Sequence, residues 1–83
     1  MNTNIVVDIN MFTRLQDISV YQNGECIQHI QPYMENVSET LRGLCVEYNP
    51  SVINFCGNKP YIEKFVKNIQ TQFKNIKVNI VSK

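Results

Sequence analysis

The sequence has no tryptophan and only three glycines, three prolines and three cysteines among its 83 residues. So little glycine leaves no glycine-rich loop of the kind that wraps a phosphate group closely. No apolar run approaches the roughly 20 residues that a membrane-spanning helix needs, and the first residues lack the basic segment of a secretory signal. These absences argue against a nucleotide-binding loop, a membrane protein and a secreted protein.

What is present is the composition of an ordinary globular domain, with 43% hydrophobic and 18% charged residues. A chain of this length forms a real core but has no room for a second domain with a cleft between the two. We therefore expect a single domain over residues 1–83. The abundance of Asn, Gln, Ile and Lys is typical of AT-rich bacterial or phage genomes.

The cysteines are too few and too widely spaced to form a framework. Cys26, Cys45 and Cys56 are odd in number, and no Cys-x-x-Cys or Cys/His pair accompanies them. This pattern argues against a disulfide scaffold and a zinc site, and it predicts a reducing, cytoplasmic location. Because each cysteine lies within an apolar pattern, we expect all three to be small buried hydrophobic residues.

The first part of the sequence predicts three strands. Residues 5–9 are β-branched and apolar on both faces, which suits a central strand covered on both sides. Residues 18–22 and 25–30 flank Asn23-Gly24, the strongest two-residue hairpin signal, because both positions tolerate a positive φ. The second and third strands are therefore expected to pair antiparallel.

A helix is predicted after Pro32, which suits a first helical position. Apolar residues then recur at steps of three and four up to Tyr48, and Asn49-Pro50 ends the helix. Gly43 inside this helix costs about 1 kcal/mol relative to alanine, which indicates close packing against a neighbour.

The remaining residues predict a strand, a helix and a final strand. Residues 51–56 are apolar on both faces and form a second central strand. Asn58 is expected to cap the next helix, Pro60 fits its first turn, and the apolar stripe of this helix extends to Phe73. Residues 76–82 alternate between apolar and polar, which is typical of a half-covered edge strand.

The order of elements is strand, strand, strand, helix, strand, helix, strand. Right-handed crossovers, with the two doubly apolar strands in the middle, give an α/β fold with two helices and a five-stranded mixed sheet of order 3-2-1-4-5. This order resembles the ribonuclease H-like fold shared by ribonuclease H, integrases, Holliday-junction resolvases and the halves of actin-like ATPases. The resemblance covers nearly the whole chain but is one of topology and hydrophobic pattern. The alternative is a ferredoxin-like α+β fold, which requires a mostly antiparallel sheet.

One residue of the family's motifs is present. The resemblance implies that Asp8, near the end of the first strand, is the catalytic or metal-binding aspartate, with Glu39 as a further acid. The other parts are missing, because residues 56–58 replace the acid expected after the fourth strand and residues 10–14 replace the phosphate loop of the ATPases. We therefore expect no catalytic residues, no metal and no cofactor. Asp8 is instead expected to cap a loop or to pair with Arg14.

Opposite charges are concentrated in the two parts of the sequence. Residues 1–57 contain two arginines and six carboxylates, a net charge of −4, whereas residues 58–83 contain six lysines and one glutamate, a net charge of +5. Asn58 and Lys59 lead from a strand into a helix N-terminus, which suits an anion. Lys64 and Lys67 share one face of that helix, whereas Lys59 points elsewhere. All these cations are lysines, whereas phosphate and base recognition favours arginine.

The sequence thus predicts a small, non-catalytic interaction or regulatory domain that acts through protein contacts. A homodimer through residues 76–81, weakened by salt or by a proline at Asn79, is the expected assembly. The alternative is a nucleic-acid-binding or degenerate metal-dependent, resolvase-like nuclease domain that uses Asp8, Glu39 and the lysine face. His29 is interpreted as a surface or half-buried residue without a partner.

Overall fold

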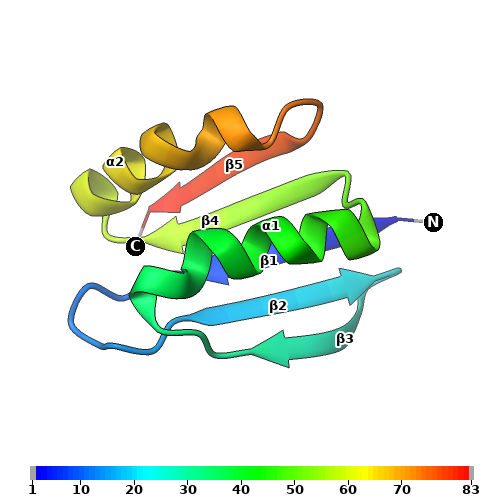
Figure 1. Ribbon diagram of the computed structural model, residues 1–83, viewed down its shortest axis with the longest axis horizontal. Helices are drawn as coiled ribbons and strands as arrows, with labels where there is room; N and C mark the ends of the chain where they lie inside the picture. Colours follow the sequence, from blue (N-terminus) through cyan, green and yellow to red (C-terminus); the bar gives the residue numbers. More distant parts are fainter. Residues whose placement is uncertain (1, 83) are drawn as a thin grey trace.

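The computed structural model describes residues 2–82, which form one compact mixed α/β domain (Figure 1). In chain order the elements are β1 (Thr3–Asp8), β2 (Asp17–Gln22), β3 (Glu25–Ile30), the 3-10 turn η1 (Met34–Asn36), α1 (Val37–Tyr48), β4 (Val52–Gly57), α2 (Lys59–Ile69), the 3-10 turn η2 (Gln70–Gln72) and β5 (Lys77–Ser82).

The five strands form one mixed sheet of order β3-β2-β1-β4-β5. The β1–β2 and β2–β3 pairs are antiparallel, whereas β1–β4 and β4–β5 are parallel. The predicted α/β fold, its five-stranded mixed sheet and its strand order are therefore confirmed. The ferredoxin-like alternative does not describe this sheet, because two of its four pairings are parallel.

Both helices lie on the same face of the sheet (Figure 1). The crossovers β3-α1-β4 and β4-α2-β5 advance in the same direction across the sheet, so two crossovers of one hand place both helices on one side. The core between the layers comprises alternate strand residues and the apolar stripes of the helices: Ile5, Val7, Ile9, Ile18, Val20, Val37, Leu41, Leu44, Ile53, Phe55, Ile62, Val66, Ile69 and Phe73.

The prediction that the two central strands are covered on both sides is wrong. In β1 and β4 every second residue is buried and the residues between are only partly buried. No helix among residues 2–82 covers that second side, which we call the open face. Val6 and Val52 lie there half-buried between neighbouring strands, and this is why a run of valine and isoleucine resembles a strand covered twice.

The turn signals of the sequence are largely confirmed. Asn23 and Gly24 have φ values of 52° and 84°, as a two-residue hairpin turn requires. Asn49 ends α1 in the left-handed conformation at φ 48°, and its N–H donates to the Cys45 carbonyl at 2.9 Å. Pro60 lies in the first turn of α2, as expected.

Three details of the helices differ from the predictions. The helical region after Pro32 begins only with the turn at Met34–Asn36, because the chain first pairs with the β1–β2 loop. Gly43 is exposed and has nothing within 4 Å of a Cβ position, so it does not mark close packing. Asn58 precedes α2 without a side-chain capping hydrogen bond.

Candidate functional site

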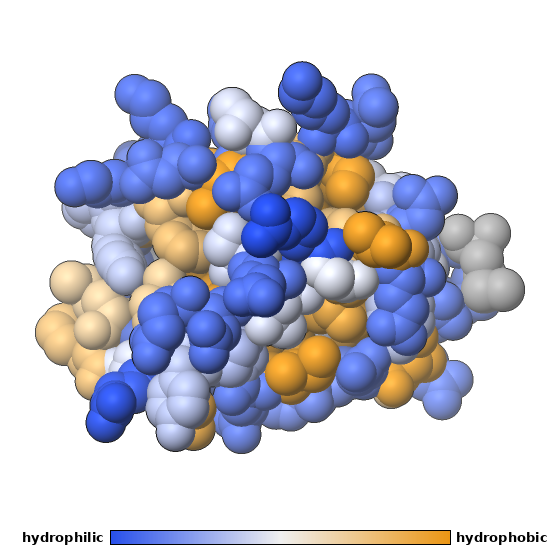
Figure 2. Space-filling model, viewed as in Figure 1, coloured by the Kyte–Doolittle hydropathy of each residue, from blue (hydrophilic) through white to orange (hydrophobic). Residues whose placement is uncertain are grey.

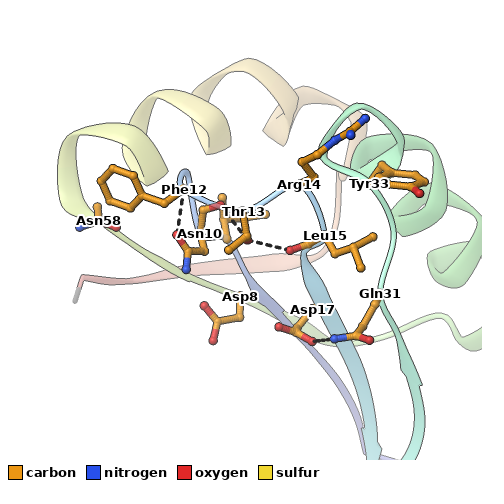
Figure 3. Close-up of a pocket in the computed structure, with 11 residues that line it drawn as sticks. Asp8, Asn10, Phe12, Thr13, Arg14, Leu15, Asp17, Gln31, Tyr33 and Asn58 are labelled. Carbon is orange, nitrogen blue, oxygen red and sulfur yellow. Dashed lines mark hydrogen bonds between the residues drawn. The ribbon is translucent and has the colours of Figure 1, made fainter.

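A hollow of about 860 Å³ opens at the carboxyl end of β1 (Figure 3). Pockets that bind small ligands in proteins have volumes of about 300–1,000 Å³. It is lined by charged, amide and apolar side chains from the β1–β2 loop and its surroundings: Asp8, Ile9, Asn10, Phe12, Thr13, Arg14, Leu15, Asp17, Gln31, Tyr33 and Asn58.

The topology of the sheet places the hollow there. Strand β1 pairs with antiparallel β2 on one side and with parallel β4 on the other. The chain leaves β1 toward β2 and leaves β4 toward α2, so the two connections diverge and open a space between them. Open α/β sheets bind ligands at such a point beyond the carboxyl ends of the strands.

The β1–β2 loop is braced by the side chain of Gln16, which is 1% exposed. Gln16 Oε1 accepts the N–H of Asn10 at 2.6 Å, and Gln16 Nε2 donates to the carbonyls of Asn10 at 3.0 Å and Thr13 at 2.8 Å. The Asn10 side chain adds a local turn, because its Oδ1 accepts the N–H of Phe12 at 2.9 Å. One buried amide thus substitutes for a strand partner and holds the loop in a single shape.

The loop is also tied to the segment that precedes α1. The N–H of Gln16 donates to the Pro32 carbonyl at 2.8 Å, and the N–H of Met34 donates to the Arg14 carbonyl at 3.0 Å. Leu15 and Tyr33 form an isolated antiparallel bridge between these two bonds. This pairing links the loop to the entrance of α1.

Four apolar side chains nevertheless point outward from this braced loop and its partner segment. Phe12 is 82% exposed, Met11 52%, Tyr33 48% and Leu15 46%. Figure 2 shows apolar atoms protruding at the lower left, where the β1–β2 loop lies in Figure 1. We call Met11, Phe12, Leu15 and Tyr33 the loop surface. Arg14 borders it, with its guanidinium 5.7 Å from the centre of the Tyr33 ring.

Two carboxylates, those of Asp8 and Asp17, line the opposite side of the hollow. Asp8 and Asp17 are directly opposite each other in the β1–β2 register, and both side chains are on the open face. His29 Nε2 lies 2.9 Å from Asp17 Oδ1, and Gln31 Nε2 donates to the same oxygen at 3.0 Å. The expectation that His29 lacks a partner is therefore wrong. Figure 3 shows the acids and Gln31 on one side of the loop and Arg14 with Tyr33 on the other.

The predicted acids Asp8 and Glu39 are not brought together. Asp8 alternates with the buried residues of β1 and therefore faces away from the helices, whereas Glu39 is exposed on α1, which covers the opposite side of the sheet. No group of three or more His, Cys, Asp or Glu residues within residues 2–82 is arranged to hold a metal ion.

The predicted anion-binding residues are also separated. Asn58 lines the hollow, but Lys59, Lys64 and Lys67 do not, and all four residues are exposed. Lys64 instead borders a second, smaller hollow of about 310 Å³ on α2, together with Tyr61, Phe65 and Asn68. The lysines thus lie on α2, apart from the carboxylates at the end of β1.

The cysteines are less buried than predicted. Cys26 is exposed, Cys45 and Cys56 are partly buried, and no disulfide joins these three described residues. Burial against the core raises the pKa of the Cys45 thiol from 9.0 to about 11. Cys45 is therefore a poor nucleophile at neutral pH.

Sequence reasoning missed the loop surface. Residues 10–15 have no periodicity, so the sequence offers Met11 and Phe12 only as two apolar residues in a polar loop.

No protein-family model matches the chain, and no curated protein matches it either. No helix within the described chain combines the length and apolar character needed to cross a membrane.

Proposed function

We propose that the chain is a small, non-catalytic cytoplasmic domain that acts through protein contacts, with the loop surface as a contact site. The proposal rests on the exposure of Phe12, whose side chain is 82% exposed on a loop that the buried Gln16 holds by hydrogen bonds. An aromatic side chain on this loop exposes apolar area that the described chain leaves mostly uncovered.

Binding energetics support this interpretation. Aromatic residues and arginine are enriched in the cores of protein interfaces, where they contribute most of the binding energy. Ordering a loop on binding costs free energy, and a loop that is already braced avoids that cost. Phe12 and Tyr33, with the Arg14 guanidinium 5.7 Å from the centre of the Tyr33 ring, supply these residue types on a braced loop and its partner segment.

The strand order and Asp8 support a proposed relationship to the ribonuclease H-like fold, in a form that has lost catalysis. Nucleases of that fold need several clustered carboxylates to hold two cations. Here Asp8 has Asp17 beside it on the open face, and Asp17 Oδ1 is engaged by His29 and Gln31. The acidic pair is therefore interpreted as a remnant or a surface feature of an interaction domain.

A photoreactive residue tests the proposed contact site. Benzoylphenylalanine replaces Phe12 in cells that naturally make the chain, and Val46 on α1, which is 83% exposed, receives the same replacement as a control. After irradiation, position 12 should form a specific protein adduct and position 46 should not. Equal labelling from both positions, or adducts with nucleic acid alone, would contradict the proposal.

Nucleic-acid binding is the second candidate, supported by the exposed lysines of α2. If Lys59, Lys64 and Lys67 contact phosphates, the logarithm of the affinity should fall with the logarithm of salt concentration by about 0.9 for each phosphate neutralised on duplex DNA. Fluorescence anisotropy with single-stranded, duplex and junction DNA measures this. Micromolar binding that is lost when Lys64 and Lys67 are changed to Glu would favour this candidate over protein contacts.

A further inference from the structure

The sheet has two edges that differ in how well they are protected. At the β3 edge the register shifts between Val20 and Tyr21, and the resulting bulge distorts the pairing of the strand that faces solvent. At the β5 edge the pairing with β4 runs without interruption from Lys77 to Ser82, and the strand contains no proline. A regular edge without a bulge is the one that favours pairing with another strand.

The side chains of β5 are more apolar than an unpaired edge requires. Ile80 is 42% exposed and Val81 is 49% exposed. Val78 and Ile80 are paired with the buried residues Ile53 and Phe55 of β4, so they face the helices. Lys77, Asn79 and Val81 alternate with them and face the open side. Each side of the edge strand therefore presents a partly exposed apolar residue. Lys77 is the one charged residue in Lys77–Ser82 that discourages this strand from pairing with another.

We infer that β5 pairs antiparallel with β5 of a second copy of this chain, around a two-fold axis that passes by Asn79. A two-fold axis normal to the sheet keeps the helices of both copies on one side and closes the assembly as a dimer. Residues directly opposite each other then share a face. Asn79 meets its own copy, Val78 meets Ile80 of the second copy, and Lys77 meets Val81 of the second copy.

This register removes the unfavourable features of the free edge. Val78 and Ile80 form two symmetric apolar pairs on the helix side, and no two like charges within Lys77–Ser82 are directly opposite. The contact also leaves the loop surface uncovered, because β4 and β1 separate β5 from the β1–β2 loop. The dimer thus adds a second contact surface to the one proposed above and does not depend on it.

The position of α2 changes the expected effect of salt. Helix α2 packs on β4 and β5, so the two-fold axis brings the α2 helices of both copies near each other. Within Lys59–Ile69 three lysines accompany one glutamate, so these helices repel each other. Salt screens repulsion between exposed charges. The dimer should therefore strengthen as salt is added. A dimer held by attraction between oppositely charged parts of the chain, as expected from the sequence, would instead weaken as salt is added.

Substitutions at Val81 test the register, because this register places Lys77 of the second copy directly opposite Val81. Val81→Lys places a lysine opposite Lys77 in two symmetric pairs, and Val81→Glu places a carboxylate there. Analytical ultracentrifugation between about 10 µM and 1 mM protein, in low and high salt, should show that Val81→Lys weakens the dimer and that Val81→Glu strengthens it, each by about threefold to tenfold. Val46→Lys on α1 is the control and should leave dimerisation unchanged.

Combining Lys77→Glu with Val81→Lys should restore the dimer. A wild-type chain that is monomeric at about 1 mM in high salt would overturn the inference, as would Val81→Lys and Val81→Glu that act alike. Circular dichroism verifies that each variant is folded, and if Val81→Lys does not fold, Val81→Glu alone decides. A monomeric chain would leave the adduct test at Phe12 unaffected, so the two proposals can fail separately.

Discussion

Gln16 and Asn10 are joined by two reciprocal hydrogen bonds, from the Asn10 N–H to Gln16 Oε1 at 2.6 Å and from Gln16 Nε2 to the Asn10 carbonyl at 3.0 Å. A side-chain amide here pairs with a backbone amide as a neighbouring strand would. Because the Gln16 side chain is buried, these bonds are partly shielded from water, and they fix the path of the loop that carries Phe12.

Gln16→Glu should destabilise the protein by about 3 kcal/mol at neutral pH. The carboxylate keeps the size of the amide but cannot donate to the carbonyls of Asn10 and Thr13, and it would be buried without a cation. Urea unfolding measures the loss, and the loss should diminish at acidic pH, where the introduced carboxyl group is protonated and donates again. Gln70→Glu, at an exposed position, is the control and should change the free energy of unfolding little.

Two glycines should respond oppositely to alanine. A Cβ on Gly57 would lie 2.9 Å from the Ile9 carbonyl oxygen and 3.3 Å from Ile62 Cβ, so Gly57→Ala should destabilise by about 1–3 kcal/mol. Gly43 lies within α1 with open space around it, so Gly43→Ala should stabilise by about 0.5–1 kcal/mol. Chemical denaturation of both variants verifies the two signs, and equal effects would contradict the packing described around Gly57.

Asp8 and Asp17 are expected to repel each other across the β1–β2 pair. Asp8→Asn removes this repulsion, so its effect on the free energy of unfolding should differ by about 0.2–1 kcal/mol between low salt and about 1 M NaCl. Thermal melts of the wild type with and without millimolar Mg²⁺ or Mn²⁺ should superimpose. A metal-dependent rise in melting temperature that disappears in Asp8→Asn would indicate a cation site and refute the non-catalytic interpretation.

Cys45 should make stability depend on alkaline pH. Because its pKa is raised to about 11 in the folded chain, the stabilisation from the protonated thiol is complete below the ordinary pKa of 9.0 and is lost as pH rises through 11. The stability difference between the wild type and Cys45→Ala should therefore shrink over that interval. Alkylation at mildly alkaline pH gives a second test, because exposed Cys26 should react before Cys45.

The hairpin illustrates what the sequence could predict and what it could not. Asn23-Gly24 correctly located the turn, and the register next to it pairs Gln22 with Glu25. Continued without interruption, that register would place His29 opposite Ile18, on the helix side. The bulge after Val20 shifts the pairing by one residue, so His29 instead lies on the open face, within reach of Asp17.

Strand order could be predicted because it follows from local periodicity and crossover handedness, whereas the candidate site follows from long-range contacts. The loop has its shape because Gln16 is buried and because its N–H reaches the Pro32 carbonyl, and neither contact leaves a periodic signal. Asp8 was identified at the right strand end. Its neighbour Asp17 was missed because its place opposite Asp8 depends on the register across the β1–β2 loop, which no local pattern of residues reveals.

The loop surface is ordered although its apolar side chains are exposed, and backbone NMR relaxation of the isolated protein measures that order. Amide order parameters over residues 11–15 should be about 0.85, as in the strands, and should fall when Gln16 is replaced by alanine. Values below about 0.6 in the wild type would show a mobile loop, and would contradict a pre-formed contact surface around Phe12.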